Sequence, residues 1–524
     1  MISRVFSFSL ARTGFFAAVA GCLSHFSGQA EVQLHPLFTD HAVLQRDKPL
    51  RIWGWAAPGE AVKVDFGGKT ANTRTGDTGR WSVELPAFPA NTSPGTLTVT
   101  GSNIVTRQDL LVGDVWLCSG QSNMEWPLSR SFQPAADIEA GTLPNLRLFT
   151  VLKNRASRPL DNFGKPAEHF WQKSGPGSVR DFSAVAYYFG RDMQSALHVP
   201  IGLINTSWGG SPAEVWMTEG MLRRNHVLDR DILSSWPKQF RDYQRNLANW
   251  EGEKAIAEKL KLPFNRPRPS LGWTPAELFN AMVQPLVPYG VAGAIWYQGE
   301  SNAGRAFEYR SLFADMIRNW REEFGQGDFP FLAVQLAPWD KNRKRSLTEI
   351  TATPVESDWA ELREAQNYAV TTLPHVGIAV ITDVGDKDDI HPSKKAPVGA
   401  RLALLAQRIA HQRPVAAYGP VLRSAIPREG HVNLTFGETA KGLRSLDGGP
   451  LTGFAIAGED RVWHWAEATF QTATTVKVSS PEVPRPVAVR YGWSDYPVVN
   501  LADSTGLPAS PFRTDDWPMT TSRR

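Results

Sequence analysis

Ser122 and His391 are the residues whose types and surroundings best suit nucleophilic chemistry. Ser122 lies in the small polar run 119–123, directly after the apolar segment 110–117, which is typical of a buried strand. A serine in a sharp turn at a strand's C-terminal end exposes its oxygen where open α/β sheets bind ligands. Because a serine hydroxyl needs a base to remove its proton, the chain must also supply a histidine and an orienting acid. The segment 388–391, Asp-Asp-Ile-His, supplies both.

Polar residues also follow two later apolar segments, as expected for sites at the edge of a parallel sheet. The stretch 205–214 includes Gly209 and Gly210, which let backbone N–H groups approach a ligand closely. An oxyanion formed at a carbonyl carbon needs such donors. The stretch 298–302 begins with Gln298, whose side-chain amide is a further candidate donor. Each stretch taken alone also fits an ordinary tight turn.

The acidic stretch 383–391 is open to more than one interpretation. Its aspartates are compatible with a solvated loop or with a calcium loop. A catalytic metal bound there would favour a metal-dependent phosphoesterase. In the third interpretation, the stretch carries the acid and the base that activate Ser122. Because polar stretches recur at successive strand ends, the sequence favours this last interpretation.

The region from about 109 to 411 alternates apolar strands with helical periods. We expect strands at 115–118, 201–204, 292–297, 331–336 and 376–381. We expect helices at 183–197, 278–283, 309–324, 362–371 and 396–409. Strands that alternate with helices in this way predict a parallel sheet covered on both faces.

The rest of the chain divides around this region. Short strands separated by Gly and Pro turns predict a small β-sandwich from 31 to 107 and a second β-rich region from 414 to 524, expected to pack on the first. The predicted α/β domain therefore spans 108–413. Within it, the polar and Trp-rich stretch at about 221–268 is interpreted as a helical insertion that forms a wall of the active-site cleft.

The first thirty residues resemble an export signal. Arg4 and Arg12 precede a short apolar run, and small residues before Glu31 offer a cleavage site, so 1–30 is interpreted as a signal peptide. In the alternative interpretation, Cys22 follows a lipoprotein-type box, the signal ends at residue 21, and Cys22 carries a lipid anchor. The apolar run is too short for a transmembrane span. We expect a periplasmic or secreted protein, or one anchored to the outer membrane.

Composition excludes several function classes. A net charge of +4 over 524 residues gives no support to nucleic-acid binding, which needs a concentrated basic patch. Two cysteines, Cys22 and Cys118, exclude a disulfide framework and a cysteine-based zinc site. The 19 tryptophans serve either core packing or stacking on sugar rings, and the candidates for stacking are Trp126, Trp208 and Trp216.

Four blocks of the sequence resemble the SGNH (GDSL) hydrolases and, more narrowly, the sialate O-acetylesterase family of carbohydrate esterases. They are the segments 120–124, 208–212, 296–302 and 388–392. The resemblance implies a flavodoxin-like, three-layer α/β/α domain with N- and C-terminal regions like β-sandwiches. It also implies removal of O-acetyl groups from sugars or glycans, with no cofactor and no metal.

The same resemblance implies roles for individual residues. Ser122 corresponds to the nucleophile, His391 to the general base, and Asp388 to the acid that orients His391. The implied oxyanion donors are the backbone N–H of Ser122, that of Gly210 or Gly209, and the side chain of Gln298, with Asn302 as second choice. The expected substrate-binding residues are Gln121, Asn123, Trp208 and Glu300.

The function that follows is a carbohydrate O-acetylesterase with a Ser-His-Asp triad and an acetyl-enzyme intermediate. Sialic acid is the family's name-giving substrate, and acetylated hemicellulose, such as xyloglucan or xylan, is the alternative. A non-catalytic carbohydrate-binding protein on an esterase fold is the alternative from another class.

Overall fold

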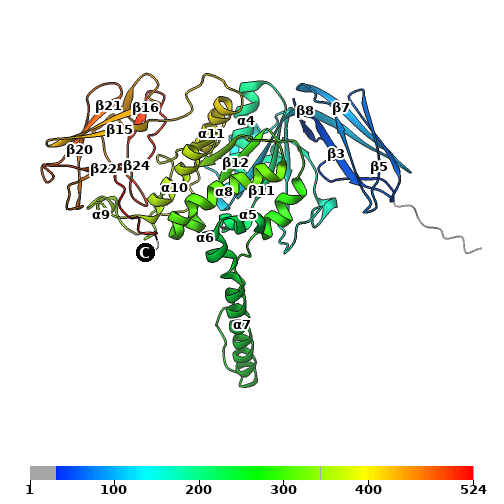
Figure 1. Cartoon of the computed structure of the whole chain (residues 1–524), viewed down its shortest axis with the longest axis horizontal. Helices are drawn as coiled ribbons and strands as arrows, with labels where there is room; N and C mark the ends of the chain where they lie inside the picture. The colour runs from blue at the N-terminus through cyan, green and yellow to red at the C-terminus, as the bar shows by residue number, and fades with distance from the viewer. Residues whose placement is uncertain (1–30, 343, 523–524) are drawn as a thin grey trace, which may run out of the picture.

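The computed structural model describes residues 31–342 and 344–522. An α/β body lies between two β-rich regions at opposite ends of the molecule (Figure 1). The leading region contains β1 (Gln33–Leu34), β2 (Val43–Gln45), β3 (Leu50–Trp55), β4 (Ala61–Phe66), β5 (Lys69–Arg74), β6 (Arg80–Leu85) and β7 (Asn91–Thr100). Along β4 and β6 buried and solvent-facing side chains alternate, as in strands with one face on a core.

The body is built on one sheet with the strand order β10-β9-β11-β8-β12-β13-β14. Its strands are β8 (Ile104–Gly120), β9 (Leu146–Thr150), β10 (Gln172–Lys173), β11 (Ile201–Ser207), β12 (Gly293–Tyr297), β13 (Phe331–Val334) and β14 (Val376–Ala379). All pair in parallel except β10, which is antiparallel to β9. From β11 to β14 the order is that of a flavodoxin-like fold, with β9 and β10 added at one edge.

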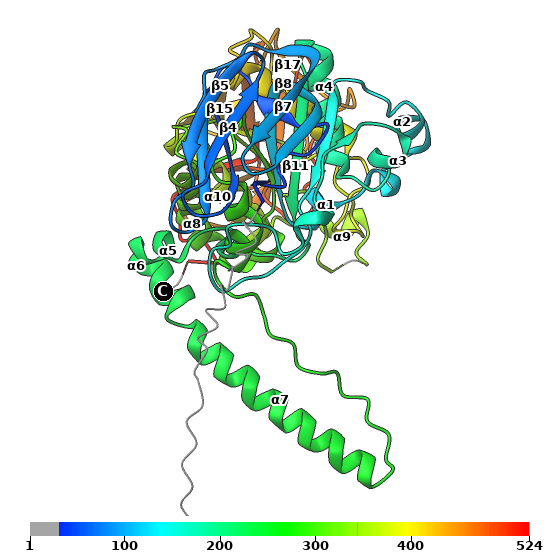
Figure 2. The ribbon, with the colours of Figure 1, turned by 90° about the vertical axis from the view of Figure 1, so that its right-hand side faces the viewer.

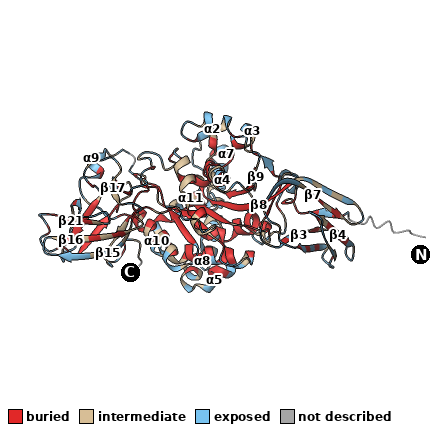
Figure 3. Ribbon diagram, turned by 90° about the horizontal axis from the view of Figure 1, so that it is seen from above, coloured by how far each residue is buried: buried red, intermediate tan, exposed pale blue. Residues whose placement is uncertain are grey.

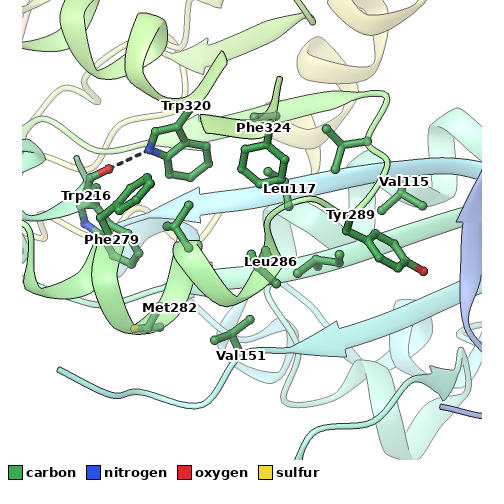
Figure 4. Packing of buried hydrophobic residues seen from close by; sticks show 14 of the residues in the cluster. Val115, Leu117, Val151, Trp216, Phe279, Met282, Leu286, Tyr289, Trp320 and Phe324 are labelled. Carbon is green, nitrogen blue, oxygen red and sulfur yellow. Dashed lines mark hydrogen bonds between the residues drawn. The ribbon is translucent and has the colours of Figure 1, made fainter. Parts of the chain in front are cut away.

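Helices cover both faces of this sheet, as predicted. On one face α4 (Ala184–Leu197) packs against α11 (Ala396–Ile409), and on the other α8 (Ala306–Phe324) packs against α10 (Asp358–Thr372). The strands between them are almost entirely buried (Figure 3). On the α8 face the indole N–H of Trp320 donates to the backbone carbonyl of Trp216 at 2.7 Å (Figure 4). The shorter helices are α1 (Ser122–Glu125), α2 (Ala135–Glu139), α3 (Pro176–Val179), α5 (Glu219–Arg224), α6 (His226–Leu228) and α9 (Leu347–Ile350).

Strand β8 belongs to two parts of the molecule. Its first half pairs with β7 and its middle pairs with β2, while its last seven residues pair with β11 and five of them also with β12. The exposure pattern changes along it, from alternating residues to a run of eleven consecutive buried ones, Leu110 to Gly120. The predicted domain boundary between 107 and 108 therefore falls inside one continuous strand.

The insertion is helical, but its main helix does not line a cleft. Helix α7 (Trp236–Lys259) projects away from the body, and the chain returns alongside it in extended form (Figure 2). Ala257 is the buried residue of this helix. The expectation that the whole insertion forms a cleft wall is therefore wrong. Because α7 has almost no apolar face to bury, the hydrophobic effect does not hold it against the body as a wall of the cleft.

The C-terminal β-region lies at the far end from the leading one, so the expectation that the two pack together is wrong (Figure 1). It contains three sheets, and it packs beside α10 and α11 instead. Its strands are β15 (Val421–Arg428), β16 (His431–Gly437), β17 (Leu443–Ser445), β18 (Phe454–Ala457), β19 (Trp463–Trp465), β20 (Glu467–Phe470), β21 (Thr475–Ser479), β22 (Ala488–Tyr491), β23 (Leu501–Asp503) and β24 (Phe512–Arg513).

Gly120, the last residue of β8, allows the chain to turn sharply at the C-terminal edge of the sheet while it lies close to β12. Its φ is +139°, and a Cβ placed there would lie 2.2 Å from the carbonyl oxygen of Tyr297. Only glycine combines this backbone conformation with such a close approach to a neighbouring strand.

We predict that Gly120→Ala lowers the free energy of unfolding by roughly 3 kcal/mol or more, because it combines backbone strain with overpacking. Urea denaturation followed by circular dichroism measures the change. Gly252→Ala is the matched control: Gly252 lies in the exposed helix α7 with nothing within 4 Å of the added methyl, and it should gain up to about 1 kcal/mol of local helix stability. Equal effects of the two substitutions would contradict the role given to Gly120.

Candidate active site

The turn that carries Ser122 is fastened to both neighbouring strands. Strand β8 ends at Gly120, and α1 begins at Ser122. The Gln121 N–H donates to the carbonyl of Tyr297 on β12, and the Trp208 N–H after β11 donates to the carbonyl of Gly120, both at 3.0 Å. Ser122 is therefore held at the C-terminal edge of the sheet, where the strand order reverses.

His391 lies against Ser122. Its Nε2 is 2.8 Å from Ser122 Oγ, within hydrogen-bond distance. His391 comes from the loop between β14 and α11, so the two residues meet only because β8 and β14 end at the same edge. This is the nucleophile–base contact that the sequence predicted.

The acid nearest to the imidazole is Asp389 rather than Asp388. Asp389 Oδ1 accepts a hydrogen bond from the backbone N–H of His391 at 2.8 Å and lies 3.5 Å from His391 Nδ1. The Asp388 carboxylate instead accepts a hydrogen bond from Lys387 Nζ at 2.5 Å. The assignment of Asp388 as orienting acid stays a prediction that this geometry does not support. Asp389 and the His391 N–H form an Asx-type turn, and this turn directs the carboxylate of Asp389, rather than that of Asp388, toward the imidazole of His391.

The environment of His391 favours its neutral form. Burial is the largest influence and lowers the pKa of His391 below its usual 6.5, while the Asp389 carboxylate opposes this and the positive charges of Lys395 and Arg130 reinforce it. The ring of Trp126 stacks on the imidazole with centroids 5.1 Å apart and an interplanar angle of 17°. A neutral imidazole can accept the proton of Ser122.

The glycine pair after β11 lies directly beside Ser122. A Cβ on Gly209 would lie 3.2 Å from Ser122 Cβ, whereas one on Gly210 would meet open space. The Gly209 N–H already donates to Glu125 Oε2 at 2.7 Å. Within residues 31–342 and 344–522, no hydrogen bond engages the Gly210 N–H. Of the two predicted backbone donors, Gly210 is therefore the one with an N–H available to an oxyanion.

The amide of Gln298 is engaged elsewhere. It is fully buried, its Nε2 donates to Asn302 Oδ1 at 2.7 Å, and its Oε1 accepts from the hydroxyl of Tyr309 at 2.8 Å. The side chain of Asn302 is also engaged, because its Oδ1 accepts from the Ala213 N–H and from Gln298 Nε2, and its Nδ2 donates to Glu214 Oε2 at 2.9 Å. Neither amide is therefore placed to serve as the third oxyanion donor that the sequence suggested for Gln298.

Three of the four residues expected to bind substrate face the protein interior instead. Gln121 is buried, and its Oε1 accepts from the N–H groups of Gly299 and Ser301. Asn123 is fully buried and donates to Glu300 Oε1 at 2.6 Å. A polar side chain next to a nucleophile can support the turn or contact the substrate, and the sequence pattern does not distinguish the two roles.

Aromatic rings form the rim of the site. Trp208, the fourth expected substrate residue, is partly exposed, and Trp273 meets it edge to face with ring centroids 5.4 Å apart. Trp273 lies five residues beyond the predicted insertion of 221–268, and no local motif marked it. Trp216, by contrast, is fully buried, and its indole N–H donates to Ser211 Oγ at 2.8 Å, so it packs in the core.

Positive charges surround the same rim. Lys153 Nζ pairs with Glu125 at 2.5 Å, and Arg155 pairs with Glu277 at 2.6 Å. The Arg130 guanidinium lies over the Trp126 ring, 3.9 Å from its centroid. Arg130 is exposed, and no carboxylate of the described part of the chain pairs with it. A negatively charged ligand at this rim would therefore meet an unneutralised guanidinium.

The remaining expectations concern metals, thiols and membranes. Across residues 31–342 and 344–522 no cluster of three His, Cys, Asp or Glu side chains is arranged to hold a metal ion. Cys118 is buried in β8, and burial raises the pKa of its thiol. Among the same residues no helix is both long and apolar enough to cross a bilayer. Cys22 and the expected signal segment lie outside the described residues.

Comparisons with known proteins agree with the fold and identify the family. Residues 270–410 match a family model described as carbohydrate esterase, sialic acid-specific acetylesterase. The sialate O-acetylesterase of Mus musculus is 30% identical, over 90% of this chain and 92% of that protein, and that of Homo sapiens is 28% identical over 88% of each. The crystal structure of a carbohydrate acetylesterase from Xanthomonas citri has a TM-score of 0.78 and 37% identity, and the match covers 93% of this chain and 100% of that one.

The matches to the mouse protein and to the crystal structure cover 90% and 93% of this chain, so they extend well beyond the residues that the family model matches. With its sheet order, its four sequence blocks and this similarity along nearly its whole length, the chain belongs to the sialate O-acetylesterase family of carbohydrate esterases, which are ester hydrolases.

Proposed function

We propose that this chain hydrolyses O-acetyl esters on carbohydrates through an acetyl-enzyme, with Ser122 as nucleophile and His391 as general base. The observation that carries the proposal is the 2.8 Å contact between Ser122 Oγ and His391 Nε2 at the edge of the sheet. Family membership supports acetylated carbohydrate as the substrate class. A non-catalytic sugar-binding protein would have no use for this contact, which argues against that alternative.

In the acylation half-reaction, His391 Nε2 takes the Ser122 proton as Oγ bonds to the acetyl carbonyl carbon. The negative charge that develops on the carbonyl oxygen is stabilised by the backbone N–H groups of Ser122 and Gly210. When the tetrahedral intermediate collapses, the bond to the sugar oxygen breaks and the protonated His391 gives its proton to that oxygen. The sugar leaves as an alcohol, and acetyl-Ser122 remains.

In the deacylation half-reaction, water takes the place of the sugar. His391 removes a proton from water as the water oxygen bonds to the acetyl carbon, and the same N–H groups hold the oxyanion. Collapse then breaks the bond to Ser122 Oγ, which recovers its proton from His391, and acetate leaves. Trp126, stacked on His391, limits the orientations of the imidazole between the two proton transfers.

We assign the orientation of His391 to Asp389, in place of Asp388. Its contact with Nδ1 holds the tautomer in which Nε2 is the acceptor for Ser122. Because 57% of the Asp389 side chain is exposed, solvent screens the pair, and its contribution should be smaller than that of a buried triad acid.

The rim supports a sialoside as the preferred substrate. Trp208 and Trp273 offer aromatic faces on which a sugar ring can stack, and Arg130 offers a guanidinium for a carboxylate. A neutral hemicellulose oligosaccharide, the second candidate, would use the aromatic rings but not Arg130. Export to the periplasm or cell surface, with or without a lipid on Cys22, would bring the enzyme to such glycans and rests on the sequence of residues 1–30.

The function is tested by acetate release from O-acetylated sialosides and from acetylated xyloglucan and xylan oligosaccharides. We expect release by the wild-type protein and a fall of at least about 10³-fold in kcat/KM for Ser122→Ala, because the nucleophile is lost. Ser129→Ala, which removes a hydroxyl near the site but outside it, is the control and should retain full activity. Undiminished release by Ser122→Ala would refute the proposal.

The same panel decides between the sugars. Arg130→Gln should raise KM for acetylated sialosides about tenfold or more, since it removes a charge-assisted hydrogen bond, and leave the neutral oligosaccharides unaffected. Wild-type activity confined to xyloglucan or xylan would favour the hemicellulose candidate.

The assignment of the acid is tested with a matched pair of substitutions. Asp389→Asn should lower kcat for p-nitrophenyl acetate by about 10- to 100-fold, less than the ~10⁴-fold effect of a buried triad acid. Asp388→Asn should leave kcat within about twofold, because its carboxylate contacts Lys387. The reverse order of effects would restore the triad that the sequence predicted.

The pH dependence follows from the lowered pKa of His391. Its neutral form is the active base, so kcat/KM should rise with pH, reach half its maximum below pH 6.5 and stay level above it. Activity is thus lost as pH falls through the pKa of the folded enzyme. Asp389→Asn should move the midpoint to lower pH, because the carboxylate raises this pKa. A midpoint above 6.5 would show that burial does not dominate the environment of His391.

A further inference from the structure

The residue after the nucleophile connects the nucleophile turn to the loop that carries His391. Asn123 is fully buried, and its side chain uses both donors and its acceptor: Nδ2 donates to Glu300 Oε1 at 2.6 Å and to the Ile390 carbonyl at 3.0 Å, and Oδ1 accepts from Lys395 Nζ at 2.5 Å. A side-chain amide with all these groups engaged holds its partners in a fixed geometry.

Two of these partners bracket the general base. Ile390 directly precedes His391, and Lys395 follows it by four residues at the start of α11. The side chain adjoining Ser122 is therefore tied to the His391 loop on both sides of the imidazole. The third partner, Glu300, begins the turn after β12, so one amide connects three separate strand ends.

Lys395 and Glu300 are ionisable side chains buried beside Asn123, and burying a charge costs free energy. Only 1% of Lys395 is exposed, and burial lowers its pKa from 10.5 to about 7. Burial also raises the pKa of Glu300, and among residues 31–342 and 344–522 no side chain donates a hydrogen bond to its second carboxylate oxygen, Oε2. Replacing a whole buried group of paired charges by well-packed apolar residues is often neutral or stabilising, so stability alone does not account for the cluster.

We propose that Asn123, Lys395 and Glu300 form a positioning cluster that sets the distance and alignment between Ser122 Oγ and His391 Nε2. The inference rests on the proposed function of Ser122 and His391 and deepens it. The cluster lies behind the nucleophile and contacts no substrate. It acts by fixing the loop that carries His391 to the turn that carries Ser122. Its loss would therefore separate Ser122 Oγ from His391 Nε2 but leave the residues of the rim in place.

Asn123 and Glu300 were expected to bind substrate, and the proposal gives them a positioning role instead. Kinetic measurements distinguish a substrate contact from a positioning role. A substrate contact that is lost raises KM, whereas misalignment of nucleophile and base lowers kcat. p-Nitrophenyl acetate suits the measurement because its hydrolysis requires Ser122 and His391 but no sugar contact.

We expect Lys395→Met and Asn123→Ala each to lower kcat for p-nitrophenyl acetate at least tenfold while KM changes less than threefold. Lys394→Met is the matched control: Lys394 is the exposed neighbour whose ammonium lies 5.9 Å from the Phe132 ring, and this variant should behave as wild type. Glu300→Gln, which keeps an acceptor for Asn123, should retain several-fold more activity than Glu300→Leu. Circular dichroism and melting curves confirm that each variant is folded.

The pH profile gives a readout that a purely structural role would not move. The charged groups facing His391 are Asp389, Arg130 and Lys395, and the charge of Lys395 lowers the pKa of the imidazole. Lys395→Met should therefore shift the midpoint of kcat/KM upward, opposite to Asp389→Asn. If Lys395→Met does not fold, Asn123→Asp gives the same test of alignment, because it keeps the size of the side chain and loses both donors.

Raised KM with unchanged kcat in these variants would overturn the proposal in favour of direct substrate contact. Wild-type kcat, KM and pH midpoint would overturn it outright. Ser122→Ala separates this failure from failure of the proposed function. If Ser122→Ala is inactive while the cluster variants are normal, only the positioning role is wrong; if Ser122→Ala turns over p-nitrophenyl acetate, the nucleophile itself is wrong.

Discussion

The contact between Ser122 and His391 joins residues 269 positions apart in the chain, and the fold is what makes it permanent. A hydrogen bond of this kind contributes roughly 1 kcal/mol on its own, far too little to order two flexible loops. The ordering comes from the parallel sheet, which brings the C-terminal ends of β8, β11, β12 and β14 to one edge and anchors each loop at its root. Gly120 then allows the nucleophile turn to lie close to β12.

The large elements could be predicted because apolar periodicity reports burial directly. The five central strands were predicted from continuous apolar runs, and the helices on both faces were predicted from their 3.6-residue period, although 278–283 forms a π-helical turn, Phe279–Val283. β9 was missed because Leu-Arg-Leu-Phe-Thr carries an arginine inside a short run. That residue, Arg147, is buried at the sheet edge and pairs with Asp109, a partner that the local sequence does not reveal.

The site was predictable in its residues and less so in their roles. Ser122, His391 and the glycine pair could be named as candidates because the chemistry demands those residue types at strand ends, and the structure places them beside one another. The acid was harder, since Asp388 and Asp389 are adjacent and the backbone of one turn decides which carboxylate faces Nδ1. Gln121, Asn123, Gln298 and Glu300 are polar and near the nucleophile, but the direction of a side chain depends on neighbours that folding supplies. Trp273 had no signal, because it follows the insertion, far from any strand end, and only the fold brings its ring to Trp208.

The double membership of β8 has a consequence for how the two halves of the molecule can be separated. Its inner residues depend on β11 and β12, whereas its outer residues depend on β2 and β7 for their backbone partners. Deleting the leading region would leave the outer half of this strand as a bare ribbon of unpaired amide and carbonyl groups, the kind of surface on which chains add to one another in aggregates. The leading region therefore covers the outer half of β8 permanently. We expect the leading region and the α/β body to unfold together.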